Sequence, residues 1–196
     1  VEGVYNMRDL GGWPTQFGGK GKYGMVYRSG MLDGITAIGK ETFFNRLNIK
    51  TEIDLRHEFS QSVLETDIHF VHAGTLQNGF IFPESIQTRP IERAFDLKTP
   101  PGIKTAFEAL ADIDNYPLVF HCSGGADRTG TLSFLLNGLL GVSYENLIKD
   151  FELTSFSRYG KRWRSNIIKK DDTFSFDESG VMEDLSNHIA FGKMYN

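Results

Sequence analysis

The chain has 196 residues of ordinary globular composition, with 40% hydrophobic and 23% charged residues. That length buries a core without disulfides or metals, so the sequence predicts one domain over residues 1–196. A net charge of −4 argues against attraction of the whole chain to nucleic acid or to an anionic membrane surface. We therefore expect no nucleic-acid partner, and any anion has to be bound by a local site.

The predicted elements alternate between strands and helices along the chain. The expected strands are Met25–Arg28, Lys50–Leu55, Ile68–His72 and Pro117–His121. The expected helices are Thr36–Leu47, Pro101 to about Asp114, Thr129–Leu140 and a segment from about Tyr144. This order predicts an α/β fold with a central, mostly parallel sheet flanked by helices.

Local signals mark the ends of several of these helices. Thr36 is the expected N-cap of the first helix and Ser143 a candidate N-cap of the last. The segment Thr129–Leu140 is apolar nearly all round, which predicts a buried helix closed by Gly141. The long polar segment 74–101 has the length of a functional lid or of a loop that carries a short helix.

Three further patterns have mainly structural interpretations. GGKGKYGMV (Gly18–Val26) has the spacing of a kinase glycine-rich loop, but no other kinase motif follows, so we interpret it as a hairpin turn. His69 and His72 would point to opposite faces of a strand, which argues against joint metal ligation. The basic cluster YGKRWRSNIIKK (Tyr159–Lys170) is either a solvated helix face or a surface that helps to select substrates.

The sequence leaves the cellular compartment open. It has no apolar run long enough for a membrane span and no signal-peptide pattern at its start. It begins at Val1 rather than Met, as a product would after removal of a targeting segment. A single cysteine excludes an internal disulfide, so cysteine usage does not separate the cytoplasm from a secreted or periplasmic location.

The stretch HCSGGADRTG (His121–Gly130) places that cysteine on the turn between a buried strand and a helix. The carboxyl ends of strands in open α/β sheets are where ligands bind. N–H groups of a glycine-rich turn, together with the positive end of the next helix, form a concave nest for an anion. An unpaired cysteine is often a small buried hydrophobe, but such a nest draws the thiol toward the nucleophilic thiolate. The stretch therefore predicts a phosphate or sulfate site with a reactive cysteine.

Residues Cys122–Arg128, here named the cysteine loop, would supply most of this site. The expected phosphate-binding residues are Ser123, Gly124, Gly125, Ala126, Asp127 and Arg128. Arg128 can hold two phosphoryl oxygens with its planar guanidinium and neutralise their charge in the transition state. Thr129 places a hydroxyl within reach of the thiolate, where a hydrogen bond would ease expulsion of the sulfur, and His121 would hold the loop from behind.

This pattern resembles the signature of the cysteine-dependent protein tyrosine phosphatase superfamily. Two more stretches, NMRDLGG (Asn6–Gly12) and YRSGML (Tyr27–Leu32), are similar to its bacterial tyrosine/serine phosphatase family. EIDLR (Glu52–Arg56) and DFELTS (Asp150–Ser155) follow in the expected order, so the resemblance covers roughly residues 1 to 160. It implies a protein-tyrosine-phosphatase-like fold and a dual-specificity-like phosphatase without metal or cofactor. Family members commonly continue further, which implies a truncated C-terminal helical part.

The resemblance also implies a general acid, which has to protonate the leaving oxygen. The bacterial branch carries an aspartate inside the loop, where this chain has Asp127. Other members of the superfamily bring an aspartate from a mobile loop before the cysteine, and Asp96 or Glu92 would take that place here, although no Trp-Pro-Asp is present. Arg8 and Asp9 are expected to buttress the cysteine loop, the alternative being a plain solvated turn.

One departure from the family bears on the substrate. Members usually carry a lysine at the position of Ala126, and that lysine is associated with phosphoinositide recognition in related lipid phosphatases. The loss of this cation favours a phosphorylated protein or a small phosphomonoester as the substrate. We therefore expect hydrolysis of phosphotyrosine, with phosphoserine and phosphothreonine as further substrates, through a cysteinyl-phosphate.

Three other functions stay open at this point. The first is a phosphoinositide or inositol-phosphate phosphatase. The second is an inactive phosphate-binding module, against which the presence of both Cys122 and Arg128 argues. The third is a thiol-redox protein, which would lack a second cysteine to resolve a disulfide.

Overall fold

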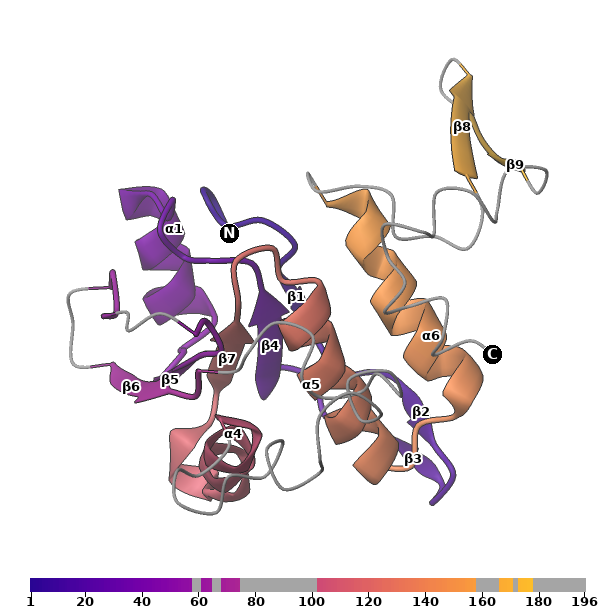
Figure 1. The fold of residues 1–196 in the computed structure, drawn as a ribbon. Coiled ribbons are helices and arrows are strands. Elements are labelled where there is room, and N and C mark those ends of the chain that lie inside the picture. The colour runs from indigo at the N-terminus through magenta and orange to yellow at the C-terminus, as the bar shows by residue number, and fades with distance from the viewer. Residues whose placement is uncertain (58–60, 65–67, 75–101, 158–165, 171–172, 178–196) are drawn as a thin grey trace, which may run out of the picture.

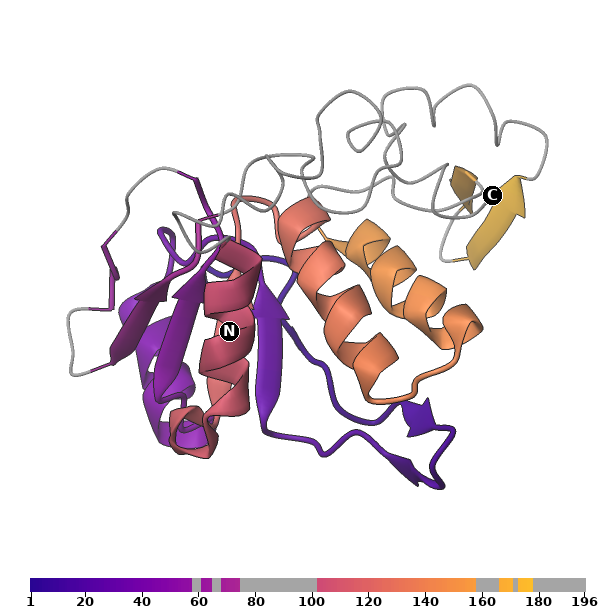
Figure 2. The same cartoon turned by 60° about the horizontal axis from the view of Figure 1, so that its bottom comes forward.

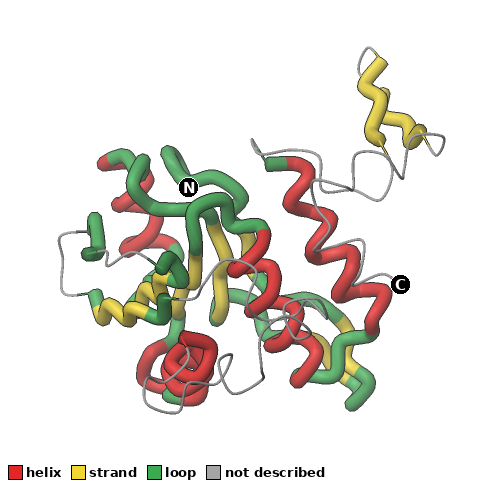
Figure 3. The backbone as a smooth tube through the Cα atoms, viewed as in Figure 1, coloured by secondary structure: helices red, strands yellow, loops and turns green. Residues whose placement is uncertain are grey.

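A computed structural model describes residues 1–57, 61–64, 68–74, 102–157, 166–170 and 173–177. Its centre is a five-stranded sheet in the order β1-β4-β7-β5-β6. The strands are β1 (Arg8–Asp9), β4 (Val26–Ser29), β5 (Thr51–Asp54), β6 (His69–His72) and β7 (Leu118–His121). All neighbouring pairs are parallel except β1, which pairs antiparallel with β4. The predicted α/β fold with a mostly parallel sheet is confirmed, and Figure 3 shows the strands surrounded by helices.

Four helices and two hairpins complete the described structure. The helices are α1 (Ala37–Glu41), α4 (Gly102–Ala111), α5 (Asp127–Leu139) and α6 (Tyr144–Glu152). A π-helical turn, Thr42–Arg46, continues α1, and 3₁₀ turns cover Ile113–Asn115 and Leu153–Phe156. The hairpins are β2 (Pro14–Thr15) with β3 (Gly19–Lys20), and β8 (Asn166–Lys170) with β9 (Thr173–Asp177). Figures 1 and 2 show α1 on one face of the sheet and α4 and α5 on the other, with α6 beside α5.

A hydrophobic core lies on each face of the sheet because successive strand residues point to opposite sides. In β7, Phe120 packs into the core under α4 and α5, whereas its neighbour Val119 packs into the core under α1. Both side chains are fully buried, as every residue of β7 and β5 is. This burial on both faces explains the continuous apolar run of β7.

The structure confirms several of the predicted element ends. Each predicted strand agrees with an observed one to within a residue at either end. Thr36 is the N-cap of α1, and its Oγ1 accepts a hydrogen bond from Gly39 N at 3.1 Å. Gly141 follows α5 with a φ of +78°, a conformation that suits glycine. Ser143 does stand at the N-cap of α6, but its hydroxyl makes no capping hydrogen bond.

The prediction that Thr129–Leu140 is buried all round is wrong. Leu139 and Leu140 are 72% and 47% exposed. The buried side chains of α5 are mostly small or polar: Thr129, Gly130, Thr131, Leu132, Ser133 and Asn137. Small residues are required there because a Cβ on Gly130 would lie 2.5 Å from the Phe151 ring of α6. The helix also begins at Asp127, two residues before the predicted start.

Two other predicted helices also differ from the structure. The segment Thr36–Leu47 is not one regular α-helix, because the π-helical turn replaces its second half. Ile38 of α1 is 61% exposed, whereas Phe43 of the π-helical turn is fully buried. The helix expected from Pro101 to about Asp114 is observed as α4, followed by a separate 3₁₀ turn. The glycine stretch 18–26 supplies β3 and the end of the β2–β3 hairpin, in line with the predicted turn.

Several predictions concern residues outside the described ranges. These include the segment after Gly74 with its candidate acids Glu92 and Asp96, and the first part of the basic cluster. Within the described ranges, His69 Nδ1 lies 2.8 Å from Asn115 Oδ1, whereas His72 Nε2 lies 2.9 Å from the carbonyl oxygen of Arg56. None of the described helices combines the length and the apolarity that crossing a bilayer requires.

Alanine substitutions at two leucines of α5, one buried and one exposed, test whether only one side of this helix is buried. We expect Leu132→Ala, at a side chain with no exposed area, to lower the free energy of unfolding by about 2–5 kcal/mol. Leu139→Ala removes the same atoms from an exposed position and should change it by less than about 0.5 kcal/mol. Urea denaturation followed by circular dichroism measures both, and equal losses would contradict the one-sided burial of α5.

Candidate active site

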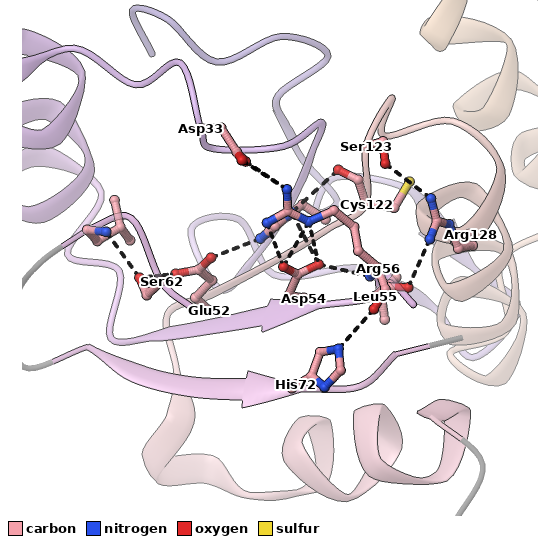
Figure 4. Close-up of polar contacts among 12 residues, drawn as sticks. Asp33, Glu52, Asp54, Leu55, Arg56, Ser62, His72, Cys122, Ser123 and Arg128 are labelled. Carbon is pink, nitrogen blue, oxygen red and sulfur yellow. Dashed lines mark hydrogen bonds and ion pairs between the residues drawn. The ribbon is translucent and has the colours of Figure 1, made fainter. Parts of the chain in front are cut away.

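The cysteine loop lies at the carboxyl end of the central strand. β7 ends at His121 and α5 begins at Asp127, so the loop is the connection between them. Cys122 is 3% exposed and belongs to the core under α4 and α5, whereas Ser123 is exposed. Figure 4 shows the Cys122 sulfur pointing toward the Arg128 guanidinium. The nucleophile and the cation predicted from the sequence are thus brought together.

Hydrogen bonds hold the carbonyl groups of the loop outward, toward neighbouring parts of the protein. The Ser123 carbonyl accepts from Met31 N at 3.0 Å. Asn6 Nδ2 donates to the carbonyls of Gly124 at 3.2 Å and Gly125 at 2.8 Å. In a trans peptide the C=O and the following N–H point in opposite directions. The N–H groups of residues 124, 125 and 126 therefore point to the inner side of the loop, as an anion nest requires.

Gly125 has the most demanding backbone position of the loop. Its φ is +66°, and a Cβ there would lie 2.5 Å from backbone atoms of Ser29 and Gly30. A Cβ on Gly124, in contrast, would meet no atom within 4 Å. Close packing of the loop on the end of β4 therefore requires a glycine at position 125, whereas position 124 has room for a Cβ.

A buried cluster of charges supports the loop from the side of α6. Arg28 of β4 has no exposed area, and its Nη2 donates to the Gly125 carbonyl at 2.9 Å. Its Nη1 binds Asp150 Oδ2 at 2.6 Å, and Arg8 Nε binds Asp150 Oδ1 at 3.3 Å. Arg8 Nη1 also donates to Asn6 Oδ1 at 2.6 Å. Arg8 thus supports the loop through Asn6 and Asp150, without touching it.

The expectation that Asp9 buttresses the cysteine loop is wrong. Its carboxylate accepts hydrogen bonds from Gly11 N and Gly24 N, both at 2.7 Å. These bonds tie together the segments next to β1 and β4. Arg8 and Asp9 are adjacent in a strand, so their side chains point to opposite faces and only one of them can reach the loop supports.

A second buried network supports the loop from the other face of the sheet. His121 Nε2 lies 2.9 Å from Glu52 Oε1. Ser62 Oγ donates to Glu52 Oε2 at 2.5 Å, as Figure 4 shows. The other ring nitrogen of His121 lies 3.4 Å from the carbonyl oxygen of Cys122. These contacts place His121 between Glu52 and the first peptide of the loop, and its role in holding the loop stays a prediction.

Arg128 is oriented by two groups on the rim of the site. Its Nη2 donates to Ser123 Oγ at 3.2 Å, and its Nη1 donates to the Leu55 carbonyl at 3.5 Å (Figure 4). Leu55 directly follows β5, so the guanidinium bridges the cysteine loop and the neighbouring strand end. Both contacts are long and use neutral acceptors, which a phosphate could replace with shorter, charge-assisted bonds.

Arg56 forms ion pairs beside the cysteine loop, just after the end of β5. It binds Asp54 through Nη2 at 2.8 Å and Asp33 through Nη1 at 2.9 Å. Burial opposes its charge, but the hydrogen bonds and charges of the two aspartates raise the pKa of Arg56 above its ordinary value. With both carboxylates in contact, Arg56 joins the β4–α1 connection to the end of β5.

The remaining predicted residues lie where α5 begins. Asp127 is the first residue of the helix and is partly buried. Ala126 precedes it with only 1% of its surface exposed, so this position can offer the nest its backbone N–H but no side chain. Thr129 is fully buried, and its Oγ1 has no hydrogen-bond partner within the described part of the chain. The structure therefore has no hydrogen bond from Thr129 to the Cys122 sulfur, and the donation expected from the sequence stays a prediction.

On the side of the sheet that faces α6, sequence reasoning missed three residues that support the loop: Asn6, Arg28 and Asp150. Each stands within a stretch similar to the family, but none was assigned a role. Two signals were present. Arg28 interrupts a short strand of a parallel sheet, and Asp150 follows the buried Leu147 by three residues on α6, which places a charge on the buried face of that helix.

The geometry defines a class of site: a cysteine and an arginine around a nest of N–H groups, between a parallel strand and a helix. The chain matches the Tyrosine phosphatase family over residues 1–187 and belongs to that family. It is a cysteine-dependent phosphatase, an enzyme that acts on phosphomonoesters.

Individual relatives agree with this assignment. The chain is 27% identical over 169 residues to the "Putative tyrosine-protein phosphatase OCA1" of Eremothecium gossypii, a match that covers 84% of this chain and 71% of the relative. It is 28% identical over 163 residues to the "Putative tyrosine-protein phosphatase H16_A0669" of Cupriavidus necator, covering 76% of this chain and 59% of the relative. Since yeast and bacterial proteins both match, the resemblance is not confined to a bacterial branch.

The fold is similar to a structure from S. cerevisiae. The core catalytic domain of the PP-IP phosphatase SIW14 superposes with a TM-score of 0.50 and 19% sequence identity, over 70% of this chain and 74% of that chain. This likeness bears out the expected phosphatase fold.

The two adjacent glycines of the loop provide a test of its geometry. We expect Gly125→Ala to lower the free energy of unfolding by more than about 1 kcal/mol, because the residue has a positive φ and its Cβ would overlap backbone atoms. Gly124→Ala should change it by less than about 0.5 kcal/mol. Urea denaturation measures both, and an unaffected Gly125→Ala protein would show that the loop does not pack on β4 as described.

Proposed function

We propose that this chain hydrolyses phosphotyrosine in proteins, with phosphoserine and phosphothreonine as further substrates, through a cysteinyl-phosphate intermediate. The observation that carries the proposal is the cysteine loop itself, whose tied carbonyls turn N–H groups inward around the Cys122 thiol and the Arg128 guanidinium. A single guanidinium and a ring of N–H groups suit the charge of one phosphoryl group.

In the first step, the thiolate of Cys122 attacks the phosphorus in line with the leaving oxygen. An S–P bond forms and the P–O bond to the substrate breaks. Asp127 donates its proton to the departing oxygen, so that the product leaves as a neutral phenol or alcohol. The inward N–H groups and Arg128 bind the equatorial oxygens, where the charge of the transition state is spread.

In the second step, water attacks the phosphorus and the S–P bond breaks. The Asp127 carboxylate accepts a proton from the water, and inorganic phosphate and the thiolate are released. A hydrogen bond from Thr129 Oγ1, which has no partner among the described residues, would stabilise the developing thiolate if the side chain turns toward the sulfur. No step of this sequence requires a metal ion.

Two considerations support phosphoprotein over a substrate with several phosphates. The relatives named above are tyrosine-protein phosphatases by name. The cysteine loop carries Arg128 as its only cation, and the nearby Arg56 is engaged with two aspartates. A second phosphate would thus find no uncommitted cation on the described rim of the site. The alternative, an inositol-phosphate substrate, has the support of a fold shared with a PP-IP phosphatase.

The first test compares the wild type with Cys122→Ser for phosphate release. The substrates are an aryl phosphate, phosphotyrosine, phosphoserine and phosphothreonine peptides, and phosphoinositides, all with a chelator present. We expect the wild type to turn over phosphotyrosine fastest and the serine variant to lose more than about 10³-fold in kcat, because a serine hydroxyl is not ionised at neutral pH.

The control for this test is binding of a phosphotyrosine peptide, which Cys122→Ser should retain. Equal activity of the two proteins would overturn the thiolate mechanism. Fastest turnover of a phosphoinositide would instead replace the proposed substrate class and leave the mechanism in place. Binding of the peptide by a wild type that releases no phosphate would favour the inactive module.

The role of Asp127 predicts a dependence on the leaving group. Asp127→Asn cannot donate a proton, so it should lower kcat about 10²-fold or more for phosphotyrosine, whose leaving phenolate is strongly basic and needs protonation. For p-nitrophenyl phosphate, whose leaving group needs little protonation, the loss should be about tenfold or less. Steady-state rates measure both. Equal losses would remove Asp127 as the acid and leave Asp96 or Glu92 for the same test.

A further inference from the structure

Arg28 is an unusual residue for its position. It lies in β4, between the parallel strand β7 and the antiparallel strand β1, and has no exposed area. Burial of an arginine charge is unfavourable unless its donors are satisfied. Yet Nε of Arg28 has no hydrogen-bond partner within the described residues. An incompletely satisfied buried cation suggests that its charge serves the neighbouring site more than stability.

The charges around Arg28 do not balance. Among the described residues, Arg8 and Arg28 form ion pairs with one carboxylate, that of Asp150, so this cluster has one more arginine than paired carboxylates. Glu152, two residues further along α6, is also buried, but the described hydrogen bonds and ion pairs of Arg8 and Arg28 do not involve it. The carboxylates of Glu52 and Asp54 lie on the opposite face of the sheet, where they contact His121 and Arg56.

The excess charge is connected directly to the cysteine loop. Nη2 of Arg28 donates to the carbonyl of Gly125, the same oxygen that accepts from Asn6. That bond turns the N–H of Ala126 inward, and the guanidinium polarises the peptide group through which it acts. Burial and the charge of Arg28 lower the pKa of Arg8 to about 9, as expected where cations outnumber carboxylates. At neutral pH, below that pKa, Arg8 remains charged.

We propose that Arg28 is a positioning residue that strengthens phosphate binding in two ways, by orienting the Gly125–Ala126 peptide and by keeping an excess positive charge beneath the cysteine loop. Arg8 contributes to the second effect without contacting the loop. The proposal rests on the proposed function, because it assumes that the cysteine loop binds phosphate.

Matched substitutions at the two arginines separate charge from structure. Arg28→Lys and Arg8→Lys keep the charge and lose the planar guanidinium, whereas Arg28→Gln and Arg8→Gln lose the charge and keep a donor. Lys149→Gln is the control, because it removes one positive charge from α6, next to Asp150, at an exposed ion pair with Glu145. Isothermal titration with inorganic phosphate at neutral pH gives a Kd for each folded protein, independent of turnover.

We expect Arg28→Gln to weaken phosphate binding by about tenfold or more, the scale of one charge-assisted hydrogen bond. At both positions the lysine variant should bind phosphate more tightly than the glutamine variant, and Lys149→Gln should stay within about twofold of the wild type. The ratio of kcat to KM on an aryl phosphate should fall mainly through KM, because the loop holds the same oxygens before and during reaction.

Several results would overturn the inference. One is a folded Arg28→Gln protein with the Kd of the wild type. Another is equal binding by the lysine and glutamine variants at both positions, since charge would then have no part. Should Arg28→Gln fail to fold, the two Arg8 variants decide the question of charge. Failure of the wild type to bind phosphate would overturn the proposed function as well, whereas normal binding by every variant contradicts this inference alone.

Discussion

The carbonyl oxygen of Gly125 is the point on which the site depends. It accepts hydrogen bonds from Arg28 of β4 and from Asn6 near the N-terminus, and Arg28 in turn binds Asp150 of α6. Three segments far apart in the sequence thus fix one peptide group. Without these bonds, the glycine-rich connection could adopt many conformations, and an anion would have to organise its N–H groups on binding.

The order and direction of the strands explain why these segments can meet at the Gly125 carbonyl. Parallel pairing places the carboxyl ends of β4, β7 and β5 side by side at the same end of the sheet. Ser29, Cys122 and Leu55 therefore lie near one another. The loop therefore packs on the end of β4 at Gly30 and receives the Arg128 contact from the end of β5. A loop between two helices would have no such rigid neighbours on both sides.

The sequence predicts the fold and the reacting groups well because both depend on local patterns. β7 is a continuous apolar run, and Cys122, Asp127 and Arg128 lie within one short motif. The supports were harder to predict because Asn6, Arg28 and Asp150 meet only after the sheet and α6 assemble, which no local pattern encodes. The same limit explains the error on α5, since apolar content does not reveal that its last leucines extend beyond its partners.

The balance of charged residues differs between the two faces of the sheet. The cysteine loop lies at the carboxyl end of β7, next to the charged groups of both faces. On the side of α1, Glu52 contacts the His121 ring and Arg56 binds the carboxylates of both Asp54 and Asp33, so carboxylates outnumber arginines there. On the side of α6, two arginines share Asp150. A site that binds dianionic phosphate and develops a thiolate benefits from excess positive charge, but an exposed cation would be screened by solvent and salt. Placement of the excess on a buried strand residue keeps it close to the loop and unscreened.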